Sequence, residues 1–205
     1  MGPKRPSKLE RAVSVVERQN GLVRARDFRK AGIPTAYLTR LCREGILERT
    51  GRGIYRLANS DVGEYHDFAV AAEQVPNGVI CLLSALVFHE LTNENPFEVW
   101  IAIDVKARRP RLSYPPVRFC RFSGAALTEG VTTHRLEGVE VRIYAAEKTL
   151  ADCLKYRNKI GLEVFLTALK RYLRRPARRR LDDLLRYASI CRVEKLMRRY
   201  LEGAL

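Results

Sequence analysis

The stretch Thr35–Leu57, TAYLTRLCREGILERTGRGIYRL, decides the fold of the N-terminal part of the chain. Its first half places Leu38 and Leu41 three residues apart among polar residues, which predicts a short amphipathic helix. Its second half has two short strand-like runs on either side of a turn that contains Gly51 and Gly53. A short helix followed at once by a basic hairpin is typical of a winged helix-turn-helix, whose partner is double-stranded DNA.

The residues before this stretch supply two further helices. Ser7 and Glu10 have the spacing of a capping box, so a first helix is expected to begin there. A second short helix is expected over residues 25–31, and Thr35 is expected to cap the third helix. We therefore assign residues 1–60 to a winged helix-turn-helix DNA-binding domain.

The outer face of the third helix and the wing carry the candidates for DNA contact. An α-helix fits the major groove, where Arg40 can bind the O6 and N7 atoms of guanine in a bidentate pair. Arg43 lies one turn further and is expected to meet phosphate, while Arg52 at the wing tip is expected to meet phosphate or the minor groove. The full set is Thr35, Tyr37, Thr39, Arg40, Arg43, Arg49, Arg52 and Arg56. A winged helix that binds protein instead of DNA is the alternative for this domain.

The charge of the chain is strongly positive and unevenly distributed. The 205 residues carry a formal net charge of +15. Residues 1–60 contribute +9, residues 61–150 contribute −3 and residues 151–205 contribute +9. A polyanionic partner such as nucleic acid explains the first basic block, where a motif accompanies the charge. For the last block, a solvated basic surface is an equally good interpretation.

The remainder of the chain, residues 61–205, is expected to be a mixed α/β domain with a small sheet and several helices. The pattern predicts an amphipathic helix from Val62 and a largely apolar helix over residues 79–91. Residues 124–138 are expected to form loops or short turns. Strands are expected at residues 99–103, 117–122 and 139–144, and helical apolar stripes at residues 150–154, 162–173, 181–188 and 193–200. The predicted fold class is α+β.

The composition places the chain in a reducing, aqueous compartment. No apolar run approaches the roughly 18 residues that a membrane span requires, and the N-terminus lacks the apolar core of a signal peptide. The five cysteines are each more than 30 residues from the next, which argues against a disulfide framework or a zinc site. A cytoplasmic location without membrane association is therefore expected.

The segment Leu41–Leu57 resembles the N-terminal domain of the AbiEi family, the antitoxins and autoregulators of type IV toxin–antitoxin and abortive-infection operons. The most specific parts are the wing, GRGIY at residues 51–55, and the segment EKTLAD at residues 147–152. Further matching segments follow in the family's order at residues 84–86, 89–91, 99–103, 153–157 and 159–161. The resemblance thus covers nearly the whole chain.

The resemblance implies a division of labour between the two domains. The N-terminal domain would bind repeats in the promoter of its own operon and repress it. The C-terminal domain would oppose a cognate nucleotidyltransferase toxin, which in this family need not involve a stable complex with the toxin. Charge alone nominates candidates for this antagonism, and they are Arg174, Arg175, Arg178, Arg179 and Arg180. A solvated helix junction is the competing interpretation of these arginines.

The sequence indicates no catalytic centre, no metal site and no cofactor. His89-Glu90 begins like a zinc-binding His-Glu-x-x-His motif, but Asn93 stands where the second histidine should be. Asp104 closes a predicted strand, yet Lys106 occupies the position where a nucleotidyltransferase would need a second acid. Two alternatives to the antitoxin remain open, namely a regulator with a ligand-sensing C-terminal domain and a nucleic-acid-processing enzyme.

Overall fold

The computed structural model describes residues 6–18, 21–60, 63–175 and 180–203 of the chain. The chain divides into two compact units, each with a hydrophobic core. The first unit comprises residues 1–76, 110–115 and 135–140, and the second comprises residues 77–109, 116–134 and 141–205. The boundary between residues 60 and 61 that the sequence suggested stays a prediction.

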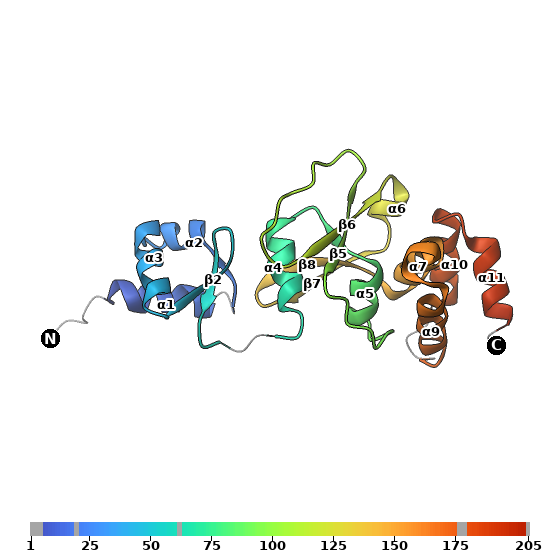
Figure 1. Ribbon diagram of the computed structural model, residues 1–205, viewed down its shortest axis with the longest axis horizontal. Coiled ribbons are helices and arrows are strands. Elements are labelled where there is room, and N and C mark those ends of the chain that lie inside the picture. The colour runs from blue at the N-terminus through green and yellow to red at the C-terminus, as the bar shows by residue number, and fades with distance from the viewer. Residues whose placement is uncertain (1–5, 19–20, 61–62, 176–179, 204–205) are drawn as a thin grey trace. The chain divides into compact units, whose positions relative to one another are not determined.

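The first unit contains a winged helix-turn-helix, as expected (Figure 1). Its helices are α1 (Lys8–Arg18), α2 (Ala25–Lys30) and α3 (Thr35–Arg43). Its strands are β1 (Val23–Arg24), β2 (Leu47–Gly51) and β3 (Ile54–Leu57), which form an antiparallel sheet in the order β1-β3-β2. The short strand β1, which the sequence pattern did not predict, pairs with β3 and so joins the wing to the helices.

Local capping explains where two of these helices begin. The capping box is confirmed, because the Glu10 amide donates to Ser7 Oγ at 3.1 Å and the Ser7 amide donates to Glu10 Oε2 at 2.7 Å. The prediction that Thr35 caps α3 is wrong. The N-cap is Pro34, held in an extended conformation at φ −65° and ψ 146°, and Thr35 is the first helical residue.

The core of the winged helix fixes which face of α3 is exposed. Leu38 and Leu41 are fully buried, together with Phe28 of α2 and Ile33 of the preceding turn. The residues on one face of a helix recur every three or four positions. Because Leu38 and Leu41 are buried, the opposite face of α3 is exposed to solvent.

The first unit also includes helix α4 (His66–Gln74). An amphipathic helix was expected from Val62, which lies outside the described residues, and the helix begins at His66. The His66 Nδ1 atom lies 2.7 Å from Glu137 Oε2, and the Tyr114 hydroxyl donates to Asp67. These contacts link α4 to the two later segments that belong to the same unit.

The second unit is built on a five-stranded sheet. Its strands are β4 (Val79–Ile80), β5 (Val99–Asp104), β6 (Val117–Phe122), β7 (Val131–Leu136) and β8 (Val139–Tyr144). The ends of β7 and β8 that flank their connecting turn, residues 135–140, belong to the first unit. The strand order is β6-β5-β4-β8-β7. The β5–β6 and β4–β8 pairs are parallel, while β4 and β5 are antiparallel, so the sheet is mixed. The predicted α+β fold class is confirmed.

Two predictions about this unit are wrong. Residues 79–91 are not one helix, because β4 precedes α5 (Leu82–Phe88). An apolar run as short as this one does not distinguish a buried strand from a buried helix, and the β-branched Val79 and Ile80 favour the strand. Residues 124–138 are not only loops, because they contain α6 (Ala125–Thr128) and the edge strand β7.

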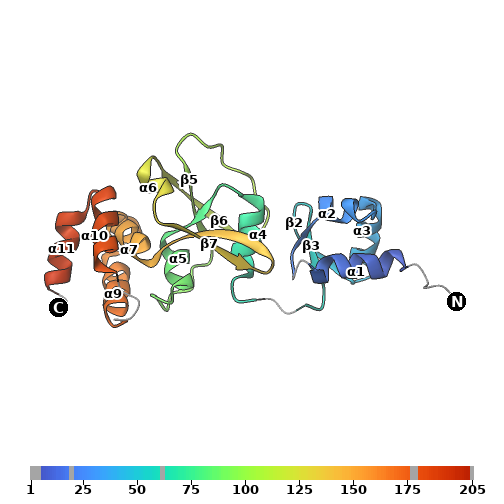
Figure 2. The same ribbon diagram turned by 180° about the vertical axis from the view of Figure 1, so that it is seen from behind.

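The C-terminal third of the chain is helical. Its helices are α7 (Ala146–Lys155), α8 (Arg157–Ile160), α9 (Leu162–Leu173), α10 (Leu181–Ile190) and α11 (Glu194–Glu202). Figure 2 shows α7, α9, α10 and α11 grouped together, and α7 packs against α5, α9 and α10. Every residue of α7 from Glu147 to Leu154 is buried, although three of them are charged. Among the described residues, the helices are too short or too polar to cross a membrane.

Candidate nucleic-acid interface

Helix α3 presents a polar, basic face to solvent. Thr35, Thr39, Arg40 and Arg43 are exposed, and Tyr37 is half-buried. This arrangement follows from the burial of Leu38 and Leu41 and matches the expected pattern. The Arg40 guanidinium carbon lies 6.0 Å from the centre of the Tyr37 ring, so these two side chains lie on the same part of the helix.

Arg40 already has an acidic partner on α3. Its Nε atom donates to Glu44 Oε1 at 2.7 Å, and 68% of the Arg40 side chain remains exposed. This hydrogen bond, together with the charge of Glu44, raises the pKa of Arg40 above its ordinary value, so the guanidinium stays charged. The spacing of four residues between Arg40 and Glu44 places both side chains on one helix face, and this spacing is the sequence signal for the pair.

The wing is a hairpin whose tip carries one exposed arginine. Arg52 and Gly53 form the turn between β2 and β3, and Gly53 adopts φ +72°, which an L-residue rarely does. The Gly53 carbonyl accepts a hydrogen bond from the Ala25 amide at 2.8 Å, which ties the tip to the start of α2. Arg52 is therefore presented from an anchored turn, with its side chain in solvent.

The other two wing arginines differ in how much of each side chain is available. Arg49 is exposed, and its Nε atom donates to the Gly51 carbonyl at 3.2 Å within the hairpin. Only 13% of the Arg56 side chain is exposed, because Arg56 donates to Glu48 Oε2 at 2.6 Å and to the Ser60 carbonyl at 2.9 Å. Arg56 thus joins the base of the wing to the segment that follows it.

The C-terminal arginines do not form one equivalent group. Arg174 is exposed at the C-terminal end of α9. Arg175 is half-buried and donates to the carbonyl oxygens of His89 and Glu90 at 2.9 and 3.0 Å, so it holds the end of α5. Arg180 is exposed and lies 3.6 Å from Asp183. The candidates Arg178 and Arg179 lie outside the described residues.

The residues weighed for catalysis have structural partners. His89 Nε2 lies 2.7 Å from the Tyr144 carbonyl, and burial lowers the pKa of His89, which favours its neutral form. The Asp104 carboxylate accepts a hydrogen bond from the Lys106 amide at 2.7 Å. Within the described ranges, histidine, cysteine and acidic side chains do not gather in groups of three or more that could hold a metal ion.

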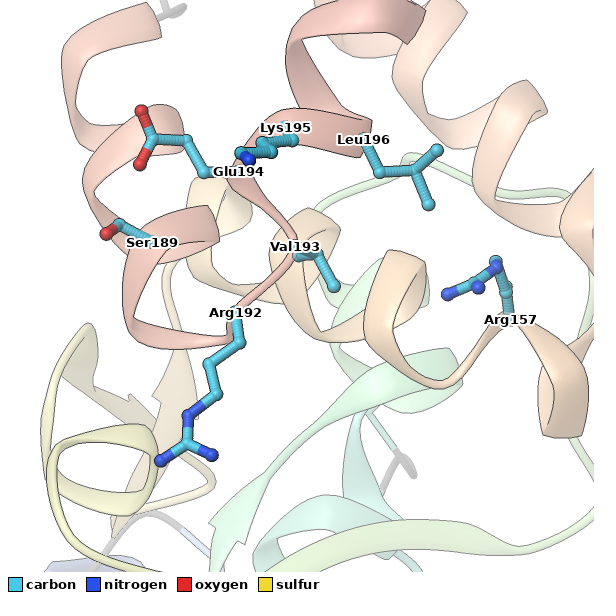
Figure 3. Close-up of a pocket in the computed structure, with 7 residues that line it drawn as sticks. All are labelled: Arg157, Ser189, Arg192, Val193, Glu194, Lys195 and Leu196. Carbon is cyan, nitrogen blue, oxygen red and sulfur yellow. The ribbon is translucent and has the colours of Figure 1, made fainter.

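A shallow hollow beside the α10–α11 turn gathers three basic residues that the sequence did not single out. They are Arg157, Arg192 and Lys195. Figure 3 shows Val193 and Leu196 facing the Arg157 guanidinium across the hollow, while Arg192 extends away from it. Glu194, whose carboxylate pairs with Arg198 at 2.7 Å, adds negative charge to the rim. The basic groups here do not converge on one point.

Comparison with known proteins identifies the winged helix. Residues 10–58 match the family model described as transcriptional regulator, AbiEi antitoxin. This segment is therefore similar to the AbiEi transcriptional regulators. The match begins within α1 and ends one residue after β3, so the matched segment and the winged helix-turn-helix coincide. The resemblance drawn from the wing sequence is confirmed for this part of the chain.

Similarity in fold to a solved structure extends beyond the matched segment. The crystal structure of the RV2827C protein from Mycobacterium tuberculosis matches with a TM-score of 0.62 over 92% of this chain and 73% of that chain. Sequence identity is 16%, so the likeness shows the fold alone. The search of curated proteins gave no significant match.

Proposed function

We propose that this protein is a DNA-binding transcriptional autorepressor and the antitoxin of a type IV toxin–antitoxin system, opposing a nucleotidyltransferase toxin. The observation that carries the proposal is the coincidence of the AbiEi regulator match with a winged helix whose exposed α3 face is basic. The segment EKTLAD, at residues 147–152 in the second unit, supports the antitoxin half through its resemblance to the same family.

The exposed basic face of the winged helix supports the repressor half of the proposal. With α3 in the major groove, Thr39 and Arg40 would reach base edges, while Arg43 and the wing-tip Arg52 would meet phosphates. To contact a guanine, the Arg40 guanidinium must either bind Glu44 and the base at the same time or give up its hydrogen bond with Glu44. That exposed pair holds the side chain in position without burying it. Occupation of promoter repeats by this domain would exclude transcription of the operon.

The repressor half is tested by a mobility shift measured over a range of salt concentrations. The full chain is titrated against its own upstream DNA and against a scrambled duplex of equal length. We expect tighter binding to the upstream DNA, because base contacts add to the phosphate contacts that both duplexes offer. Equal, salt-sensitive binding to both duplexes would contradict specific repression and reduce the basic face to a general polyanion surface.

Two substitutions separate reading of bases from contact with phosphate in the same assay. Arg40→Ala is expected to weaken binding to the upstream DNA about 10- to 100-fold and to leave the scrambled duplex nearly unaffected. Arg52→Ala is expected to weaken binding to both duplexes by a similar factor. It is also expected to reduce the slope of log affinity against log salt concentration by about one unit. Lys170→Ala, which removes an exposed charge from α9, is the matched control. Equal losses on both duplexes for Arg40→Ala would rule out base reading by this residue.

The antitoxin half is tested by growth rescue. The full chain is co-expressed with the nucleotidyltransferase toxin that the proposal implies, from promoters that the chain does not control. We expect the wild-type chain and the double variant Arg40→Ala/Arg52→Ala to restore growth equally, since toxin antagonism is assigned to the second unit. Replacing the exposed Arg174 and Arg180 by glutamate is expected to abolish rescue. Failure of the wild-type chain to rescue would refute the antitoxin assignment and leave the DNA-binding result standing.

A further inference from the structure

A basic hollow of about 430 Å³ lies in the second unit, beside the edge strand β6 and helix α8. We call it the β6 hollow. Its charged lining residues are all cationic, and they are Arg109, Arg118, Arg121 and Lys159. Trp100, Phe119 and Tyr156 contribute aromatic rings. The volume lies within the range of about 300–1,000 Å³ that is typical of small-molecule sites.

The guanidinium of Arg118 is held at the wall of this hollow by two neighbours. Its Nε atom lies 2.5 Å from Glu98 Oε1, and its central carbon lies 4.7 Å from the centre of the Trp100 ring. The side chain is 54% exposed, so about half of it is accessible to a ligand. A guanidinium fixed in this way can stack on a planar ring and loses little conformational entropy when it does so.

Tyr156 forms another part of the wall. Its ring stacks on the Phe122 ring at 5.5 Å with an interplanar angle of 6°, which holds it in place. Burial raises the pKa of Tyr156 to about 12, so the phenol is neutral at physiological pH and adds no negative charge to the hollow. The Lys159 Nζ atom lies 5.6 Å from the centre of the same ring, which places this ammonium group beside the cavity.

The positive charge of the hollow is largely uncompensated. Within the part of the chain that the structure describes, no carboxylate forms an ion pair with Arg109 or Lys159. Arg121 donates through Nη1 to the carbonyl oxygens of Asp104, at 2.7 Å, and Ala107, which holds the segment leading to Arg109. The pKa of the Cys120 thiol is lowered mainly by its hydrogen bond with Cys81, and the charges of Lys159 and Arg118 act in the same direction.

We propose that the β6 hollow binds a nucleoside polyphosphate. The Arg118 guanidinium, backed by Trp100, offers a flat cationic face on which a base can stack. Arg109 and Lys159 supply cations for the phosphate groups, for which arginine and lysine are the usual partners. The site belongs to the second unit and involves neither α3 nor the wing, so it stands or falls independently of the proposed repressor function.

Binding is measured on the full chain by calorimetric titration with ATP and GTP, with tryptophan emission as a second readout. Trp100 is the single tryptophan of the sequence and lies in the wall of the hollow, so its emission reports this site alone. We expect saturable binding accompanied by a change in emission. The free nucleosides and inorganic triphosphate should each bind at least tenfold more weakly, because each offers only half of the required contacts.

Variants locate the ligand. Arg109→Ala/Lys159→Ala changes two exposed residues and is expected to weaken binding by at least tenfold, since each lost phosphate contact is charge-assisted. Lys170→Ala removes a comparable exposed charge outside the hollow and should leave binding unchanged, as should Arg40→Ala/Arg52→Ala on the winged helix.

Four results would overturn the proposal. One is the absence of saturable binding by either nucleotide. A second is equally tight binding of inorganic triphosphate, which would mean that the base makes no contact. A third is loss of binding in the winged-helix variant or in Lys170→Ala, which would place the nucleotide elsewhere. The fourth is binding of single-stranded oligonucleotides without any binding of mononucleotides, which would make the hollow part of a nucleic-acid groove.

Discussion

Replacement of Lys148 by methionine is expected to lower the free energy of unfolding by about 3–5 kcal/mol, because it leaves a buried carboxylate without its cation. The Lys148 Nζ atom lies 2.7 and 2.6 Å from the two carboxylate oxygens of Asp152, and the side chains are 0% and 1% exposed. The Cys191 thiol donates to the same carboxylate at 3.1 Å, and the ammonium group lies 4.2 Å from the centre of the Tyr144 ring. The measurement is urea unfolding at neutral pH.

The control for this prediction is the double variant Lys148→Met/Asp152→Leu. It replaces both charges by apolar groups and is expected to recover most of the lost stability, since a buried pair contributes little beyond what hydrophobic packing supplies. If the double variant is as unstable as the single variant, loss of packing around Lys148, and not an unpaired Asp152, is the cause.

The pH dependence of the single variant follows from the same carboxyl group. Burial raises the pKa of Asp152 above its ordinary value, and loss of Lys148 raises it further. A carboxyl whose pKa is higher in the folded state favours folding at low pH and loses that contribution as pH rises through the folded-state pKa. The deficit of Lys148→Met relative to wild type should therefore shrink as pH falls toward the ordinary range of a carboxyl.

Gly130→Ala is expected to destabilise the second unit by about 2–4 kcal/mol, because it combines backbone strain with overpacking. Gly130 adopts φ +72°, and a Cβ atom added there would lie 2.7 Å from Lys148 Cβ and 3.1 Å from the Tyr187 ring. Both side chains are buried, so neither can move away cheaply. The measurement is again urea unfolding. An unchanged slope of the free energy of unfolding against urea concentration would show that the unfolded state is unaffected.

Gly45→Ala separates the two causes. Gly45 has nearly the same φ as Gly130, +70°, but its added Cβ atom would meet nothing within 4 Å. Only the backbone strain applies, so the expected loss is about 1–2 kcal/mol. Equal losses at the two positions would show that the contact with Lys148 and Tyr187 relaxes without cost.

Local signals predicted much of this fold. The Ser7–Glu10 capping box, the α3 face opposite Leu38 and the glycine-containing wing are each encoded within a few neighbouring residues. Strand β6 was predicted with its observed bounds, residues 117–122, because its residues are strongly β-forming and its neighbours break the pattern. Such features require no knowledge of distant partners.

The features that the sequence did not predict depend on contacts with residues that are distant in the sequence. The residues of β7 are largely polar and become a strand because β8 lies beside them. The apolar stripe at residues 150–154 does not indicate that the charged residues of α7 are also buried, and they are buried because α5, α9 and α10 pack around the helix and Lys148 pairs with Asp152. Helical periodicity predicts that a helix has two faces and does not reveal that a second layer covers the polar one.

The two candidate sites also differ in whether neighbouring residues in the sequence are enough to predict them. The α3 candidates follow from helical spacing alone, and their roles in DNA contact stay predictions. The β6 hollow brings together Trp100, Arg118 and Lys159 from three separate elements. Parallel pairing of β5 with β6 places Trp100 opposite Arg118, and this register is invisible in the sequence.

The turn that joins β7 to β8 limits how the N-terminal segment of such regulators can be exchanged during evolution. Glu137 belongs to the first unit, where its carbonyl accepts a hydrogen bond from Leu22 at 3.3 Å and its carboxylate binds the Gly63 amide at 2.9 Å and His66 at 2.7 Å. The first unit is therefore assembled from separate stretches of the gene, and a recombination event at residue 60 would transplant an incomplete piece. We expect new operator preferences in this lineage to arise by substitutions on α3 and the wing, with wholesale exchange of the N-terminal segment disfavoured by its ties to Glu137.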